Sequence, residues 1–121
     1  MLTGQIRKFD DLPEDALQRR YPRFQPGNFE INMQLVAKVE ELARAKGCTP
    51  AQLAINWVRS LSRRAGMPTI IPIPGASTAA RVEENSKLID LDDGELAQID
   101  AILAKFTTVG ERYPAGVPTN T

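Results

Sequence analysis

The chain has 121 residues, of which 42% are apolar and 6% aromatic, enough for one domain with a core of ordinary size. Its 15 basic and 15 acidic side chains balance without a basic stripe, so we expect no nucleic acid and no membrane as a partner. The single cysteine, Cys48, excludes an internal disulfide, and the absence of histidine removes the commonest metal ligand and general base. No metal site is expected. Without a signal peptide pattern or a membrane-spanning run, we expect a cytoplasmic location.

The first 27 residues are rich in proline, glycine and charged residues, and they show neither helical nor strand periodicity. We expect a loop with one short helical turn between Glu14 and Arg19. Met1-Leu2 looks like the end of an apolar strand that should lie upstream. A helix is then predicted from Asn28 to Lys46, with apolar side chains along one face, Asn28 as its N-cap and Gly47 at its C-terminal end.

A second helix is predicted from the Thr49-Pro50 pair, which supplies an N-cap and a favoured first-turn proline, to about Arg64. It is apolar on nearly all sides, a distribution that predicts burial against two neighbours. We expect Trp57 to be a packing residue with its indole N–H hydrogen-bonded. Cys48, with no neighbouring base evident, is expected to be structural rather than reactive.

A β-branched run at 69–73 predicts a buried parallel strand, which Pro74-Gly75 ends. Small polar residues then begin a short helix that carries Arg81. The unpaired N–H groups of a first helical turn, and the positive end of the helix dipole, suit a phosphate. Ordinary capping by Ser77 or Thr78 is the commoner role of such residues, and spacing alone favours it over anion binding.

The last predicted helix starts at a capping box formed by Asp92 and Glu95 and runs through Phe106. The tail, 107–121, has no periodicity and is expected to be an extended arm or disordered. A single strand has no ladder partner. The chain is therefore expected either to be completed by another chain or to be a piece of a larger α/β domain, with 1–106 as its folded part.

Four blocks of sequence follow one another in a recognisable order. They read G-C-T-P-A-Q-L-A-I-N-W-V at 47–58, I-P-I-P-G at 71–75, R-V-E-E-N at 81–85 and L-D-D-G-E-L-A-Q-I-D at 91–100. Together they resemble the C-terminal third of the aldo-keto reductases, in particular the pyridoxal-reductase-like branch, and 2–15 looks like the loop after the seventh barrel strand. The resemblance implies an α/β fold. It would be the C-terminal portion of a (β/α)8 TIM barrel, mostly helical in this chain with one or two parallel strands.

The resemblance also implies a cofactor site. In this family the loop after the last strand holds the adenosine 2′-phosphate of NADP(H), whose hydride passes to an aldehyde or ketone. Arg81 would stack on the adenine or pair with the phosphate, while Glu84 and Asn85 would hydrogen-bond the adenine amino edge. Ser77 and Thr78 would face the phosphate. The implied cofactor-binding residues are Gly75, Ala76, Ser77, Thr78, Arg81, Glu84 and Asn85.

Two departures limit what can be carried over. Many family members have Lys-Ser where this chain has Gly75-Ala76, so one cation and one hydroxyl are missing and NAD(H) remains an alternative to NADP(H). The family's catalytic Asp, Tyr, Lys and His lie on earlier barrel strands, and no residue here takes such a role. We therefore expect a cofactor-binding part of an oxidoreductase acting on small carbonyl substrates, inactive alone. Its partner would be the missing barrel portion or a second copy. The alternative is a small helical protein-interaction module without enzymatic activity.

Overall fold

The computed structural model describes residues 1–117, which form helices and irregular segments and contain no β-strand. The last four residues of the predicted tail, 118–121, lie outside this described part. The α-helices are α1 (Asn28–Lys46), α2 (Pro50–Ser60), α3 (Ala79–Ser86) and α4 (Asp93–Lys105), and the short 3₁₀ helices are η1 (Phe9–Asp11), η2 (Leu17–Arg20), η3 (Pro22–Phe24) and η4 (Leu61–Arg63).

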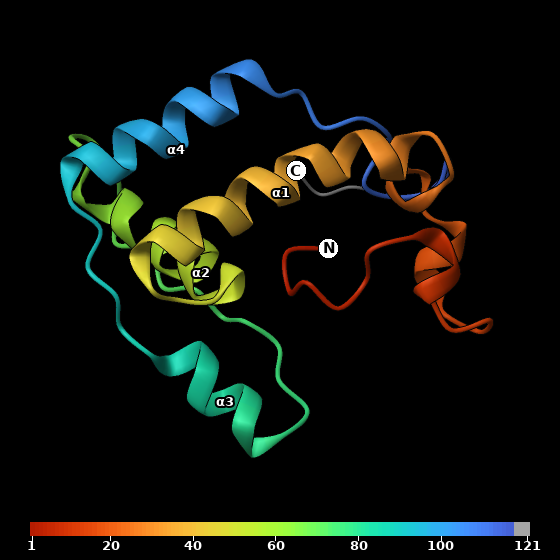
Figure 1. Ribbon diagram of the computed structural model, residues 1–121, viewed down its shortest axis with the longest axis horizontal. Coiled ribbons are helices and arrows are strands. Elements are labelled where there is room, and N and C mark those ends of the chain that lie inside the picture. Colours follow the sequence, from red (N-terminus) through yellow and green to blue (C-terminus); the bar gives the residue numbers. More distant parts are fainter. Residues whose placement is uncertain (118–121) are drawn as a thin grey trace.

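Figure 1 shows that α1, the longest helix, runs beside α4 and packs against α2. The N-terminal segment with η1, η2 and η3 lies at the start of α1. In contrast, α3 lies away from α4, between two extended connections, and packs against α2. The helix that carries the predicted cofactor residues is thus attached to the rest of the chain through α2.

The core lies where α1, α2 and α4 meet. Ala43, Leu53 and Leu91 are buried at its centre. The apolar face predicted for α1 is confirmed, since Phe29 and Val36 on that helix are also buried. Partly buried side chains complete the cluster around its centre, namely Val39, Leu42, Cys48, Trp57, Ile89, Leu96 and Ile99.

The predicted start of α1 is wrong by one residue, because Gly27 rather than Asn28 is the N-cap. Gly27 has a φ of 87°, a conformation that glycine adopts without strain, and its N–H is accepted by the Glu30 carboxylate. The Asn28 amide instead donates to the Pro22 carbonyl, at 2.9 Å. The predicted end is confirmed, as Gly47 follows α1 in the left-handed conformation.

The predicted Thr49 cap and Pro50 start of α2 are confirmed. The helix does not continue to Arg64: it ends at Ser60, whose hydroxyl donates to the Trp57 carbonyl at 2.6 Å, and η4 follows. A hydroxyl bonded to its own turn competes with the regular helical ladder, which is consistent with the tighter 3₁₀ turn.

Trp57 packs against the core, as expected, but the prediction for its indole was wrong, because the Nε1 atom is buried without a hydrogen-bond partner within residues 1–117. Cys48 is partly buried against the same core. Burial raises the pKa of the Cys48 thiol, which disfavours the thiolate and fits a structural role.

The strand predicted at 69–73 does not form. The segment is irregular, and Ile71 and Ile73 are 77% and 92% exposed. Only Ile70 is held, through its N–H and carbonyl, which both bond the Ser62 hydroxyl. A strand needs a neighbouring strand to pair its backbone, and residues 1–117 supply none.

The first part of the tail is irregular, as predicted, but it is attached to the body. The buried Asn32 side chain accepts the Val109 N–H at 3.0 Å and donates to the Val109 carbonyl at 2.9 Å. Next to it, Gly110 has a φ of 81° and lies directly against the backbone of η3. This part of the tail therefore packs beside the start of α1.

Replacing Gly110 with alanine is expected to detach this part of the tail. A Cβ atom there would lie 2.8 Å from the Pro22 carbonyl carbon and 2.9 Å from the Arg23 backbone nitrogen, and a positive φ strains any L-residue. We expect a loss of about 1–3 kcal/mol of stability and faster amide exchange at Val109. Gly116→Ala is a partial control, since it has a similar φ but no atom near its Cβ position. If the Val109 amide exchanged as slowly in Gly110→Ala as in the unsubstituted chain, the tight contact between Gly110 and η3 would be contradicted.

Candidate functional site

The predicted cofactor segment is an exposed loop followed by the short helix α3. Thr78 is the N-cap: its hydroxyl accepts the Arg81 N–H at 3.3 Å. The capping prediction is therefore confirmed. The Thr78 cap satisfies only one N–H group of the first turn of α3. An α-helix leaves its first N–H groups without intrahelical partners, and here those of Ala79 and Ala80 lie in an exposed stretch with Ser77. This end of α3 presents donors to an anion.

Two further contacts shape the segment. The Arg81 guanidinium donates through Nη1 to the Glu84 carboxylate at 2.9 Å, and both side chains are about three-quarters covered. The Asn85 amide donates to the Gly75 carbonyl at 3.4 Å and so connects the far side of α3 to the loop. Gly75, Ala76, Ser77, Thr78, Arg81, Glu84 and Asn85 therefore belong to one continuous loop-and-helix unit.

Thr49, the N-cap of α2, and Gln52, in its first turn, both reach this unit, although local sequence pattern did not place them there. The Thr49 hydroxyl donates to the Glu84 carboxylate at 2.9 Å, and the Gln52 amide donates to the Glu84 carbonyl at 3.2 Å. Gln52 is buried, a costly place for an amide without partners. A buried polar residue in a largely apolar helix was the available signal, but its partner, more than thirty residues away, could not be deduced from local pattern.

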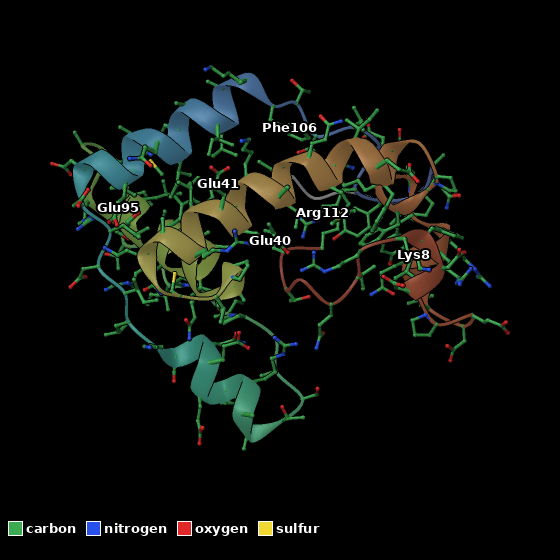
Figure 2. The ribbon with its side chains drawn as sticks, in the orientation of Figure 1. Lys8, Glu40, Glu41, Glu95, Phe106 and Arg112 are labelled. Carbon is green, nitrogen blue, oxygen red and sulfur yellow. The ribbon has the colours of Figure 1, made fainter. Side chains whose placement is uncertain are left out.

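Glu84 and Thr49 line a polar hollow of about 450 Å³ that also reaches the N-terminal segment. There Arg7 donates to Glu40 of α1 at 2.9 Å, and Glu40 lies on the side of α1 that faces this segment (Figure 2). Arg44 lines the same hollow. The hollow thus joins α3 to cationic side chains that are distant in sequence.

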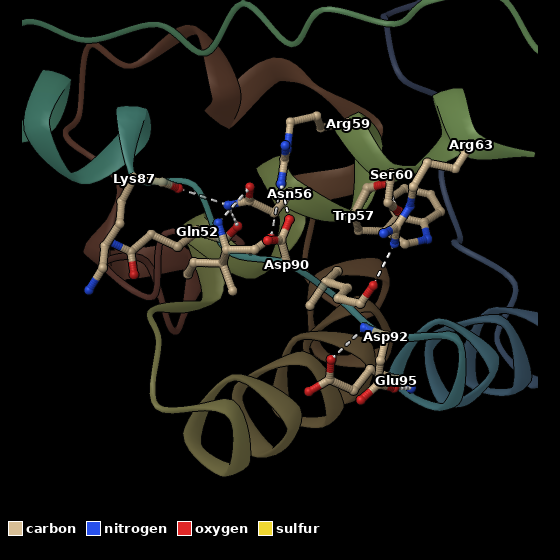
Figure 3. Close-up of polar contacts among 12 residues, drawn as sticks. Gln52, Asn56, Trp57, Arg59, Ser60, Arg63, Lys87, Asp90, Asp92 and Glu95 are labelled. Atoms are coloured by element: carbon tan, nitrogen blue, oxygen red, sulfur yellow. Dashed lines mark hydrogen bonds and ion pairs between the residues drawn. The ribbon is translucent and has the colours of Figure 1, made fainter.

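The connection that follows α3 is fastened to α2 (Figure 3). The buried Asn56 amide donates to the Lys87 carbonyl at 3.0 Å, and its oxygen accepts the Ile89 N–H at 3.1 Å. Arg59 adds bonds to the Ile89 carbonyl and to Asp90. These contacts hold the connection between α3 and α4 against α2. The predicted Asp92–Glu95 capping box at the start of α4 is confirmed.

The arrangement suits binding rather than catalysis. It offers a guanidinium, helix-start N–H groups, a carboxylate and an amide, the groups that recognise a phosphate and a nucleobase edge. Residues 1–117 hold no cluster of three or more histidine, cysteine or acidic side chains that could bind a metal. None of the helices they form has the length and apolar character to cross a membrane.

Comparison with known proteins decides the family. Residues 1–104 match the model of the aldo/keto reductase family. The chain belongs to this family. Its resemblance to aldo-keto reductases, inferred above from four sequence blocks, is thereby confirmed.

Two relatives cover nearly all of this aldo-keto reductase chain. The aldo-keto reductase yakc [NADP(+)] of Schizosaccharomyces pombe is 35% identical over 117 residues, which are 95% of this chain and 33% of that protein. A putative pyridoxal reductase of Saccharomyces cerevisiae is 33% identical over 122 aligned residues, covering 93% of this chain and 35% of that protein. The chain spans about a third of the length of these relatives. No solved structure matches it.

The family implies a (β/α)8 barrel, and the absence of strands from residues 1–117 leaves the predicted parallel strands unconfirmed. The side chains present do fit the adenosine end of a nicotinamide cofactor. Within the described residues, Nη1 is the one side-chain nitrogen of Arg81 with a hydrogen-bond partner, so the other edge of the guanidinium is open in the sense that it has no protein acceptor there, while the side chain is 24% exposed. A planar cation with an open edge suits either a phosphate or an adenine face.

Proposed function

We propose that 75–85 bind the adenosine 2′-phosphate end of NADP(H), as the cofactor-binding part of an oxidoreductase that reduces aldehydes or ketones. The observation that carries the proposal is Arg81, in the first turn of α3, with one edge of its guanidinium held by Glu84 and the other without an acceptor among residues 1–117. Family membership supports it, and one relative carries NADP(+) in its name. The bound cofactor would supply the hydride.

Each side chain has a specific task in this proposal. The open edge of Arg81 pairs with the 2′-phosphate or lies over the adenine, and the exposed helix start at Ser77 and Thr78 directs N–H groups at the phosphate. Glu84 and Asn85 hydrogen-bond the adenine amino edge. Gly75 and Ala76 line the loop without adding charge, so the preference for NADP(H) over NAD(H) depends mainly on Arg81. Catalytic groups are not assigned to any residue of this chain.

Replacing Arg81 with alanine is expected to weaken binding of adenosine 2′,5′-bisphosphate about tenfold to a hundredfold. The reason is the loss of a charge-assisted hydrogen bond worth about 1.5–3 kcal/mol. The affinity for adenosine 5′-monophosphate, which lacks the 2′-phosphate, should fall much less. The Kd of both nucleotides can be measured by titration of the chain, with NMR amide shifts locating the site at 75–85.

Arg81→Lys is the matched control, because it keeps the positive charge and loses the planar guanidinium. Its affinity for the bisphosphate should lie between those of the unsubstituted chain and Arg81→Ala. Alanine is a good helix former and the Arg81–Glu84 pair is an i,i+3 pair whose side chains are each about a quarter exposed, so folding stability should change by less than about 1 kcal/mol. Unchanged bisphosphate affinity in Arg81→Ala would contradict the proposed site.

The alternative from the sequence, a helical interaction module, is supported by apolar side chains that the structure leaves exposed, such as Ile71, Ile73 and Leu88. Such a module would bind neither nucleotide. The same titration therefore separates the two functions.

A further inference from the structure

We infer that Thr49 and Gln52, at the start of α2, are positioning residues that orient Arg81 for the cofactor by holding Glu84. This inference rests on the proposed function of 75–85. It assigns to α2 a part of the site that local sequence pattern places only on α3.

The short helix α3 needs an external support. It has eight residues, none of them buried, and extended segments precede and follow it (Figure 1). Isolated helices of this length are unstable in water, so tertiary contacts must hold it in place. The contacts with α2 supply that support, and two of them converge on Glu84.

Glu84 is bound from three directions. One carboxylate oxygen accepts the Thr49 hydroxyl at 2.9 Å, the other accepts Arg81 Nη1 at 2.9 Å, and the Glu84 carbonyl accepts the Gln52 amide at 3.2 Å. Because each carboxylate oxygen has its own donor, the carboxylate cannot rotate without breaking a bond. The edge of Arg81 that it holds is therefore fixed relative to α2.

Thr49 and Gln52 have this capacity because capping uses only half of their hydrogen-bonding groups. In the capping box of α2, the Thr49 hydroxyl accepts the Gln52 N–H at 3.2 Å, and the Gln52 side-chain oxygen accepts the Thr49 N–H at 3.1 Å. Both roles need acceptors. The hydroxyl hydrogen and the amide NH₂ remain as donors, and both are given to Glu84.

The same chain contains a capping box that lacks such donors. At the start of α4, Asp92 and Glu95 exchange the same two bonds with backbone N–H groups, at 2.8 and 2.9 Å. Carboxylates cap a helix as well as a hydroxyl and an amide do, but they cannot donate when ionised. Capping therefore does not require the donors of Thr49 and Gln52, and both donors instead form hydrogen bonds with Glu84 of α3.

This comparison defines the variants. Thr49→Asp and Gln52→Glu convert the α2 box to the type found at α4, keeping both capping acceptors and removing one donor to Glu84 each. Thr49→Ser is the matched control, because it keeps the hydroxyl as acceptor and as donor. We expect the first two variants to bind adenosine 2′,5′-bisphosphate about tenfold more weakly, and Thr49→Ser within about twofold of the unsubstituted chain.

A readout without ligand tests the positioning itself. In the unsubstituted chain and in Thr49→Ser, the Arg81 Nη1–H signal should be resolved and should exchange slowly with solvent, because Glu84 accepts a hydrogen bond from this nitrogen. In Thr49→Asp and Gln52→Glu it should shift and exchange faster, while the α2 amide signals and helix content stay the same. A residue that served only to cap α2 would leave the Arg81 signal unmoved.

The outcomes separate the two proposals. An unchanged Arg81 signal in both donor-removing variants, or bisphosphate affinity equal to that of the unsubstituted chain, overturns the positioning role. If the unsubstituted chain binds no bisphosphate, the proposed function fails, and the positioning of Arg81 by α2 is then decided by its side-chain signal alone. If Thr49→Asp fails to fold because it brings two carboxylates together, Gln52→Glu decides the question.

Discussion

Replacing Asn56 with alanine is expected to lower the free energy of unfolding by about 2–4 kcal/mol, because it removes three hydrogen bonds from a buried position. The Asn56 amide donates to the carbonyls of Gln52 and Lys87, at 2.9 and 3.0 Å, and its oxygen accepts the Ile89 N–H at 3.1 Å. Asn56 is 1% exposed, so water cannot replace these partners in the folded state. Urea unfolding followed by circular dichroism measures the loss.

Asp90→Ala is the matched control on the same connection. The Asp90 side chain is 93% exposed and pairs with Arg59, and exposed ion pairs contribute little, so a change of less than about 1 kcal/mol is expected. If Asn56→Ala were no more destabilising than Asp90→Ala, the buried amide would not be what fastens the 87–92 connection to α2.

Asn56→Asp adds a pH dependence with a defined sign. Aspartate keeps the acceptor for Ile89 but places a buried negative charge against two carbonyl oxygens, so its folded-state pKa should lie above the ordinary value of about 3.9. A pKa raised on folding means that stability is greatest below the unfolded pKa and falls as pH rises through the folded one. The variant should therefore approach the wild-type stability at acid pH and lose it toward neutral pH.

The helix limits that depend on local capping were predictable, whereas the end of α2, predicted at Arg64 and found at Ser60, was not. Gly47, the Thr49-Pro50 pair and the Asp92–Glu95 box all use groups within four residues of one another, and the structure confirms each. The predicted Asn28 cap was wrong, and this too has a local cause: Gly27 is the N-cap, and its N–H donates to the Glu30 carboxylate.

The predicted strand at 69–73 is unconfirmed for a non-local reason. β-Branched residues favour strands, but this segment has no regular secondary structure, and two of its isoleucines are exposed. Its backbone N–H and C=O groups need a neighbouring strand, a requirement that no property of the segment itself can meet.

In the candidate site, too, the contacts within α3 were predictable from the sequence, and the contacts between distant segments were not. Sequence pattern placed Arg81 and Glu84 one turn apart on a short helix, and the structure pairs them at 2.9 Å. It did not identify Thr49 or Gln52 as neighbours of Glu84, because local pattern gave Thr49 only its capping role and Glu84 lies more than thirty residues away in the sequence. The cofactor assignment of the loop and helix stays a prediction until nucleotide binding is measured.

Leu53→Ala is expected to have the largest effect on stability, a loss of about 3–5 kcal/mol. Leu53 is 4% exposed at the junction of α1, α2 and α4, against Ala43 and Leu91. It also lines an apolar hollow of about 90 Å³ between these helices, so truncation enlarges a space that the packing has not closed. That places the cost toward the upper part of the range for such truncations. Thermal unfolding and urea titration both measure it.

Leu53→Met is the control, because a side chain of similar volume should cost less than about 1.5 kcal/mol. Equal losses for alanine and methionine would mean that Leu53 does not close the junction. Leu53 lies next to Gln52 on α2 but contacts the core, whereas Gln52 contacts α3. Under conditions where Leu53→Ala remains folded, its affinity for adenosine 2′,5′-bisphosphate should therefore stay within about twofold of the unsubstituted chain, in contrast to Gln52→Glu. Loss of affinity in both variants would indicate that the site depends on the stability of α2 as a whole rather than on the donors to Glu84.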